Sequence, residues 1–167
     1  MGYGLELLTR DEYTSWLQEM PSDACTFCEW RKYQYVLLQG SYWLWIACRA
    51  PYWKYHTMFI PKRHFVEMDE MTVVEMGELI EMYSSAIKKM RSLGLVINEK
   101  AIERFLFFWR LRDTNFEETS QTRRLSHFHM HLTPDVEGLF DPLLTKDARD
   151  WDPTRLAGNR GQTTVSP

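Results

Sequence analysis

The amino-acid sequence predicts an α+β fold: an antiparallel sheet with one long helix and a shorter N-terminal helix. Three observations lead to this prediction. Apolar residues recur at helical spacing from Leu5 to Met20 and again, over a longer run, from Asp69 to Leu93. Short runs rich in aromatic and branched residues, separated by turns, lie before and after the long run. Elements of these kinds in this order are expected to form one sheet with its helices packed on it.

The predicted elements follow from local signals. The first helix has Thr9 and Asp11 available as capping residues, and Pro21 breaks it. The long helix has Asp69 or Thr72 near its start and Gly94 at its end. Pro61 is expected to end the third strand. The strands are expected at 33–38, 42–48, 57–60, 104–112 and 125–134.

The composition narrows the class of protein. The 167 residues suffice for one domain with a hydrophobic core, and the 44% hydrophobic content argues against disorder for most of the length. The net charge of −3 argues against non-specific nucleic-acid binding. No apolar run approaches the roughly 20 residues of a membrane helix. The N-terminus lacks the pattern of a secretory signal, and three cysteines do not suggest a disulfide framework. We therefore expect a cytoplasmic protein without a membrane partner.

The most informative segment is 125–134, which holds three of the five histidines of the chain: His127, His129 and His131. Alternate side chains of a strand point to opposite faces, so the three imidazoles would share one face while the apolar residues between them are buried. This face has three interpretations: packing alone, ligands of a catalytic metal, or a histidine nucleophile supported by two neighbours. A strand does not need three imidazoles to fold, which argues against packing alone.

A second feature is the motif Cys25-Thr26-Phe27-Cys28. Two thiolates at this spacing can both reach one tetrahedral zinc ion, and His64 and His127 are available as the other two ligands. A redox pair and two packed thiols are the alternatives. A redox motif is expected to open a helix in a βαβ unit, which the sequence does not predict here. His64 follows two cations after Pro61, and a solvated basic turn is the alternative for that segment.

Together these motifs resemble the histidine-triad superfamily. Residues 127–133 match its signature His-φ-His-φ-His-φ-φ, in which φ is apolar, except for Thr133 at the last position. Residues 55–64 are similar to the family's GHTLVIPKRH segment, with Tyr55 in place of the glycine. The motifs span about residues 23–134. The resemblance implies a single histidine-triad-like domain over 1–157, with a C-terminal extension over 135–157, and we expect residues 158–167 to be a disordered tail.

The resemblance also implies a reaction and a metal site. In this family the middle histidine attacks the α-phosphate of a nucleotide, and water or another acceptor resolves the nucleotidyl-histidine intermediate. The match assigns the nucleophile to His129 and supporting catalytic roles to His127 and His131. In zinc-bearing members, including relatives of galactose-1-phosphate uridylyltransferase, the metal is structural, and the corresponding ligands here are Cys25, Cys28, His64 and His127.

The chain departs from the family at the phosphate-binding loop. Members carry a glycine-containing segment just before the triad, whereas residues 113–120 contain no glycine. We expect Arg123, Arg124 and Gln121 to contact the phosphates instead; an exposed basic turn is the alternative for the two arginines.

The leading hypothesis is a nucleotide hydrolase or nucleotidyl transferase, such as a phosphoramidase or a dinucleoside polyphosphate hydrolase. The alternative is a zinc-stabilised nucleotide-binding module with little turnover. The resemblance further implies a homodimer, formed through the long helix and the adjoining strand.

Overall fold

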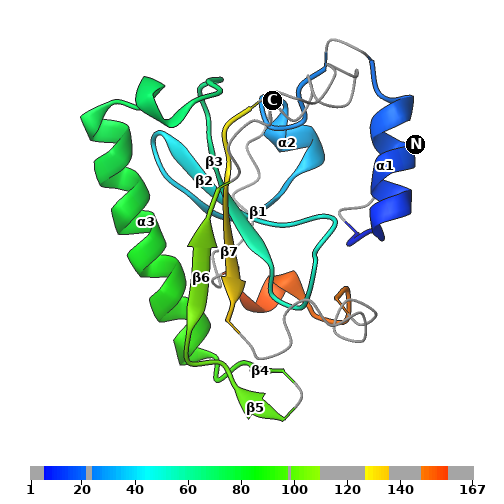
Figure 1. The fold of residues 1–167 in the computed structure, drawn as a ribbon, viewed down its shortest axis with the longest axis vertical. Coiled ribbons are helices and arrows are strands. Elements are labelled where there is room, and N and C mark those ends of the chain that lie inside the picture. Colours follow the sequence, from blue (N-terminus) through cyan, green and yellow to red (C-terminus); the bar gives the residue numbers. More distant parts are fainter. Residues whose placement is uncertain (1–5, 22–23, 98, 110–126, 136–147, 158–167) are drawn as a thin grey trace, which may run out of the picture.

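The computed structural model describes residues 6–21, 24–97, 99–109, 127–135 and 148–157 (Figure 1). Its centre is a five-stranded antiparallel sheet in the order β1-β2-β3-β7-β6. The strands are β1 (Tyr35–Gln39), β2 (Trp43–Ala47), β3 (Thr57–Pro61), β6 (Phe105–Phe108) and β7 (Met130–Pro134), with a separate hairpin of β4 (Val96–Ile97) and β5 (Lys100–Ala101). The helices are α1 (Arg10–Glu19), α2 (Trp30–Tyr33) and α3 (Val73–Ser92), and the 3-10 turns are η1 (Met68–Glu70) and η2 (Pro153–Arg155). The predicted α+β fold is confirmed.

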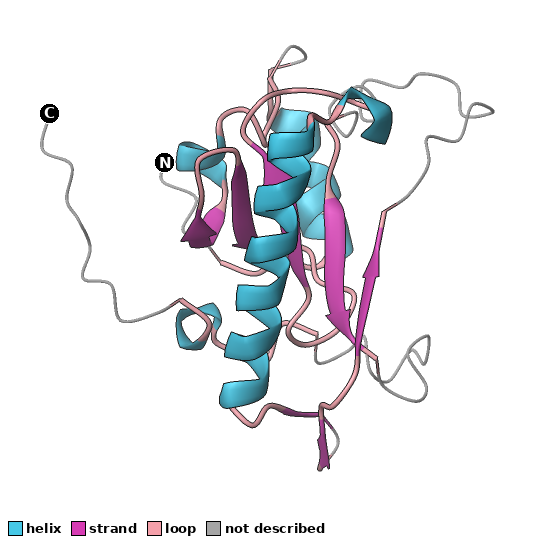
Figure 2. Ribbon diagram, turned by 90° about the vertical axis from the view of Figure 1, so that its left-hand side faces the viewer, coloured by secondary structure: helices cyan, strands magenta, loops and turns pink. Residues whose placement is uncertain are grey.

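The middle of the sheet is buried on both faces. Side chains of β2 and β3 alternate between two hydrophobic cores, as the pleat of a strand requires. One core contains Trp43, Trp45 and Phe59 together with the buried face of α3. The other contains the alternate residues of the same strands, packed against Phe27 and Trp30. Figure 2 shows α3 lying along one face of the sheet. The opposite face is therefore the one on which polar site residues can gather.

Helix α3 begins and ends at local signals that the sequence carries. The Oγ1 of Thr72 accepts the Glu75 N–H at 3.2 Å, and the Glu75 carboxylate accepts the Thr72 N–H at 2.8 Å, which closes a capping box. Gly94 follows the helix with a φ of +54°, in the left-handed region that glycine adopts without strain. The first residues of the predicted helix form the separate turn η1 instead.

Several other boundaries also differ from the sequence-based expectation. Helix α1 is shorter than the predicted run, because the capping box of Thr9 and Glu12 starts it at Arg10. Pro61 does not stop β3 but is its last residue, paired with Trp43. Tyr33 belongs to the short helix α2 and not to a strand.

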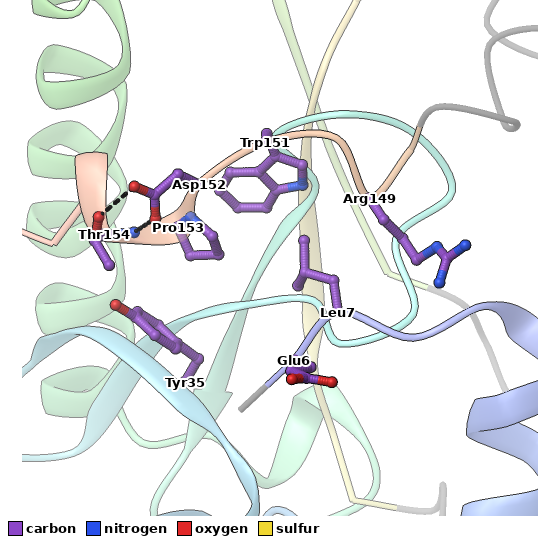
Figure 3. Close-up of a pocket in the computed structure, with 8 residues that line it drawn as sticks. All are labelled: Glu6, Leu7, Tyr35, Arg149, Trp151, Asp152, Pro153 and Thr154. Atoms are coloured by element: carbon purple, nitrogen blue, oxygen red, sulfur yellow. Dashed lines mark hydrogen bonds between the residues drawn. The ribbon is translucent and has the colours of Figure 1, made fainter. Parts of the chain in front are cut away.

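The segment 148–157 packs back onto the domain. Leu156 is buried in the core beneath α3, and the Trp151 ring lies 5.5 Å from that of Tyr55. This segment, β1 and the residues before α1 line an open pocket of about 500 Å³ (Figure 3). The residues that line it include no histidine and no cysteine: Glu6, Leu7, Tyr35, Arg149, Trp151, Asp152, Pro153 and Thr154.

None of the helices in the described residues has the length and apolar character needed to cross a membrane.

Candidate functional site

The histidine segment keeps its alternation beyond the end of the sheet ladder. Strand β7 starts only at Met130, so His127 and His129 precede it. The Phe128 N–H donates to the carbonyl of Phe65 at 2.7 Å, which holds the segment in place there. Phe128 and Met130 lie in the core beneath α3. The imidazoles lie on the opposite side of the segment, away from this core, and the ring centres of His129 and His131 are 4.9 Å apart.

His127 belongs to a cluster of four side chains that can ligate a metal. One ligand atom from each of Cys25, Cys28, His64 and His127 lies within 4.8 Å of the others. The Cys25 Sγ is 3.4 Å from Nδ1 of His127, and the Cys28 Sγ is 3.3 Å from Nδ1 of His64. The turn before α2, the turn after β3 and the histidine segment each contribute to this cluster, which therefore joins three separate parts of the chain.

Hydrogen bonding prepares His127 as a ligand through Nδ1. Its Nε2 lies 2.9 Å from the carbonyl oxygen of Pro61, which can only accept, so Nε2 carries the proton. The lone pair of Nδ1 then faces both sulfurs. Burial lowers the pKa of His127 to about 4, which keeps the ring neutral near pH 7. A neutral imidazole with its second nitrogen bonded to a carbonyl is the usual form of a metal-bound histidine.

The donor set fits a structural zinc ion. Two thiols and two imidazoles form the Cys₂His₂ set of closed tetrahedral zinc sites, in which all four ligands come from the protein. Burial, followed by the neighbouring Cys25, raises the pKa of the Cys28 thiol. A bound dication reverses this effect because a coordinating thiol is deprotonated. The zinc site expected from the sequence is thus assembled from the same four residues.

His129 is oriented by the backbone of His127. Its Nδ1 lies 2.9 Å from the His127 carbonyl oxygen, so Nδ1 donates and the lone pair is on Nε2. The Phe27 ring contacts both imidazoles, with centres 5.6 Å from His127 and 5.3 Å from His129. The orientation of His129 therefore depends on the position of the metal-binding cluster.

His131 has a buried partner that the sequence analysis did not assign to the site. The Nε2 of His56 lies 2.9 Å from the Nδ1 of His131, and both residues are buried. The Tyr52 N–H donates to the Nδ1 of His56 at 3.2 Å. His56 is consequently protonated on Nε2 and donates to His131, whose own proton is then on Nε2. The only sequence signal for His56 is its place before Thr57 in the segment 55–64, and that segment predicts a strand without a role for His56.

The structure does not test the contacts predicted between the protein and the substrate phosphates. Arg123, Arg124 and Gln121 lie outside the residues that the structure describes, and their roles stay predictions.

Comparison with known proteins identifies the fold. No protein-family model and no curated protein matches the sequence. A Zn-bound histidine triad family protein from Mycobacterium smegmatis superposes with a TM-score of 0.56 and 19% identity, over 82% of this chain and 90% of that chain. A histidine triad nucleotide-binding protein from Candida albicans gives a TM-score of 0.54 and 16% identity, over 70% of this chain and 78% of the other.

A GalT-like protein from Arabidopsis thaliana is also similar, with a TM-score of 0.56 and 15% identity. The match covers 84% of this chain but 47% of that chain, so this protein corresponds to about half of it. The identities are low, and the likeness is one of fold. The chain has the fold of the histidine-triad proteins, as its motifs predict.

Proposed function

We propose that this protein is an enzyme that cleaves a phosphate-linked nucleotide through attack of His129 on the α-phosphate. The observation that carries this proposal is the hydrogen-bond geometry of two adjacent imidazoles, from which their protonated nitrogens are assigned. His129 has its lone pair on Nε2, and His131 has its proton on Nε2. The ring centres are 4.9 Å apart, so a nucleophile and a hydrogen-bond donor can face one phosphorus centre.

The first half of the reaction transfers the nucleotide to the protein. The Nε2 of His129 attacks phosphorus, the N–P bond forms, and the bond to the leaving group breaks. The Nε2–H of His131 would donate a hydrogen bond to the departing atom, which leaves with the electron pair of its bond to phosphorus, while the Nδ1–H of His129 stays bonded to the His127 carbonyl. His56 holds His131 in this tautomer. A second half-reaction, with water or another acceptor, breaks the N–P bond and restores the imidazole, so the protein acts as a hydrolase or a transferase.

The remaining residues are assigned to binding the metal and the phosphates of the substrate. Cys25, Cys28, His64 and His127 would hold zinc, which supplies a structural cross-link and no acid–base chemistry. Charge that develops on the phosphate oxygens needs preorganised donors. We propose Arg123, Arg124 and Gln121 for this role. A cytoplasmic location and a homodimer complete the proposal.

A trapping experiment tests the covalent step. Protein is mixed with α-labelled nucleotides that differ in leaving group and is quenched under alkaline or acidic conditions. A phosphoramidate adduct is expected to survive alkali, to be lost in acid, and to map to His129 by mass spectrometry. His129→Ala should form no adduct while it retains zinc and its melting temperature. His131→Ala is the matched control, expected to turn over slowly but still to form adduct.

Turnover by His129→Ala near the wild-type rate would contradict the covalent mechanism. Nucleotide binding without adduct or turnover in the wild-type protein would favour the alternative, a zinc-stabilised nucleotide-binding module.

A further inference from the structure

An arginine outside the histidine motifs reaches the histidine cluster through one aromatic ring. The Tyr52 ring stacks on His56 with centres 5.1 Å apart and 17° between the planes, and it lies 6.3 Å from the ring of His131. The guanidinium carbon of Arg10 lies 4.5 Å from the centre of the same Tyr52 ring. A nitrogen of that guanidinium also donates to the Tyr52 hydroxyl at 3.2 Å. One ring thus separates a permanent positive charge from two imidazoles of the site.

The charge of Arg10 is not neutralised by a carboxylate in the described part of the chain. Some exposed arginines there pair with carboxylates, such as Arg63 with Glu75 at 2.9 Å and Arg149 with Glu12 at 3.5 Å. Arg31, like Arg10, instead contacts an aromatic ring. Within the described residues Arg10 contacts the ring and the hydroxyl of Tyr52, and a guanidinium on an aromatic face keeps its capacity to bind oxygens at its edge.

The backbone of Arg10 is held in a fixed position. Arg10 is the first residue of α1, directly after the capping box formed by Thr9 and Glu12. The helix is anchored by a small core of its own that includes Trp16 and Leu17. A guanidinium presented from an anchored helix loses less conformational freedom on binding an anion than one on a loose segment.

We propose that Arg10 binds the anionic part of the leaving group, so that the favoured substrates carry further phosphates beyond the α-phosphate. The inference rests on the proposed function and names the substrate class for that site. The Tyr52 ring lies between Arg10 and the imidazoles of His56 and His131, so we assign Arg10 no contact with the phosphorus attacked by His129. A leaving group several atoms long that departs past His131 would bring a second phosphate toward Arg10. A guanidinium binds phosphate oxygens bidentately, which an amine leaving group cannot exploit.

The test compares two substrates that differ only in the leaving group: diadenosine tetraphosphate and an adenosine 5′-phosphoramidate of an uncharged amine. Arg10→Gln should lower kcat/KM for the tetraphosphate about tenfold or more, mainly through KM, and change the phosphoramidate less than about twofold. Arg31→Gln is the matched control, because Arg31 is also exposed and lies 4.4 Å from the ring of Trp30. It should change neither value.

Equal losses on both substrates would overturn the inference, because they would mean that Arg10 only supports Tyr52 and His56. No loss on either would overturn it as well.

Binding measurements separate this inference from the proposed function. In a His129→Ala background, calorimetry with ATP and AMP reports anion binding without chemistry. The added Arg10→Gln change should weaken ATP binding about tenfold and leave AMP binding unchanged. This outcome would support the anion subsite even if the wild-type protein forms no adduct. Equal ATP affinity with and without Arg10 would refute the subsite whether or not the adduct forms.

Discussion

At the scale of single residues, the proposed chemistry depends on which nitrogen of each imidazole carries the proton. His56 fixes that choice for His131, because it accepts from the Tyr52 N–H and donates to the His131 Nδ1. His56→Leu removes the donor. We expect kcat to fall about 10- to 100-fold with little change in KM, since His56 contacts His131 and not the substrate.

Imidazole nitrogen NMR provides a readout that general destabilisation would not change. His131 should lose its uniform Nε2–H tautomer in the His56→Leu protein. His56→Asn retains a side-chain donor and should recover part of the rate. An unchanged kcat in His56→Leu would show that the His131 tautomer does not limit the reaction.

The sequence predicts the histidines on one face but not the partner of His131. The alternation alone indicates that His127, His129 and His131 share a side. The pairing with His56, 75 residues away, depends on the register between β3 and β7, in which Met58 lies opposite His131. Neither register nor strand order can be read from local patterns. The Cys₂His₂ set could be predicted because its residue types and spacing restrict the chemistry to a few choices.

At the scale of elements, Glu75 joins the start of α3 to the turn after β3. Both oxygens of its carboxylate accept from Arg63 at 2.9 Å, and one also caps Thr72. The Arg63 hydrogen bonds lower the pKa of Glu75 to about 2. A depressed pKa in the folded state contributes stability above the unfolded-state value near 4.5, and this contribution is lost as the pH falls toward 2.

We therefore predict that Glu75→Gln destabilises the protein by about 1–3 kcal/mol at pH 7 and by clearly less near pH 3. Urea unfolding of both proteins at several pH values measures the difference. Glu81→Gln, at an exposed position of the same helix, should change stability little at either pH. A pH-independent effect of Glu75→Gln would show that shape and not charge matters at this position.

Element boundaries depended on contacts that the sequence does not display. Pro61 extends β3 because a terminal strand residue can pair without donating a ladder hydrogen bond there. The short helix α2 presents Trp30 to the core on the face opposite α3, a tertiary contact that overrides the strand preference of its aromatic residues. Capping residues were more informative: Thr9 and Thr72 both start helices, as predicted.

At the scale of the whole molecule, the four residues of the predicted zinc site join segments that are up to 102 residues apart, those of Cys25 and His127. We expect close to one zinc per chain. Cys25→Ser should release the zinc and lower the melting temperature, since the free energy of metal binding contributes to folding.

Cys48→Ser is the control for this prediction. It replaces a buried thiol outside the cluster and should keep the zinc even if the packing is disturbed. Elemental analysis and thermal melts are the measurements. Protein purified without chelators that contains no zinc would contradict the site.

The outer edge of the sheet supports the predicted homodimer. Strand β6 pairs with β7 on one side and ends the sheet on the other within the described residues. Its four residues are half-buried apolar side chains, and Trp109 beyond it is 39% exposed. An apolar, unpaired edge readily accepts a strand from another chain. We predict that a second copy pairs along β6, so that light scattering finds about twice the 20.0 kDa of one chain.

A lysine on the edge tests where the two copies meet. Leu106→Lys places a charge on β6 and should yield monomers, because a lysine on an edge strand opposes strand pairing. Val96→Lys alters an exposed apolar residue on the separate β4–β5 hairpin and should leave the dimer intact. Wild-type protein that remains a 20.0 kDa species at micromolar concentration would mean that β6 serves only the core of its own chain. A dimer that survives Leu106→Lys would move the interface to another face, with the exposed start of α3 as the next surface to vary.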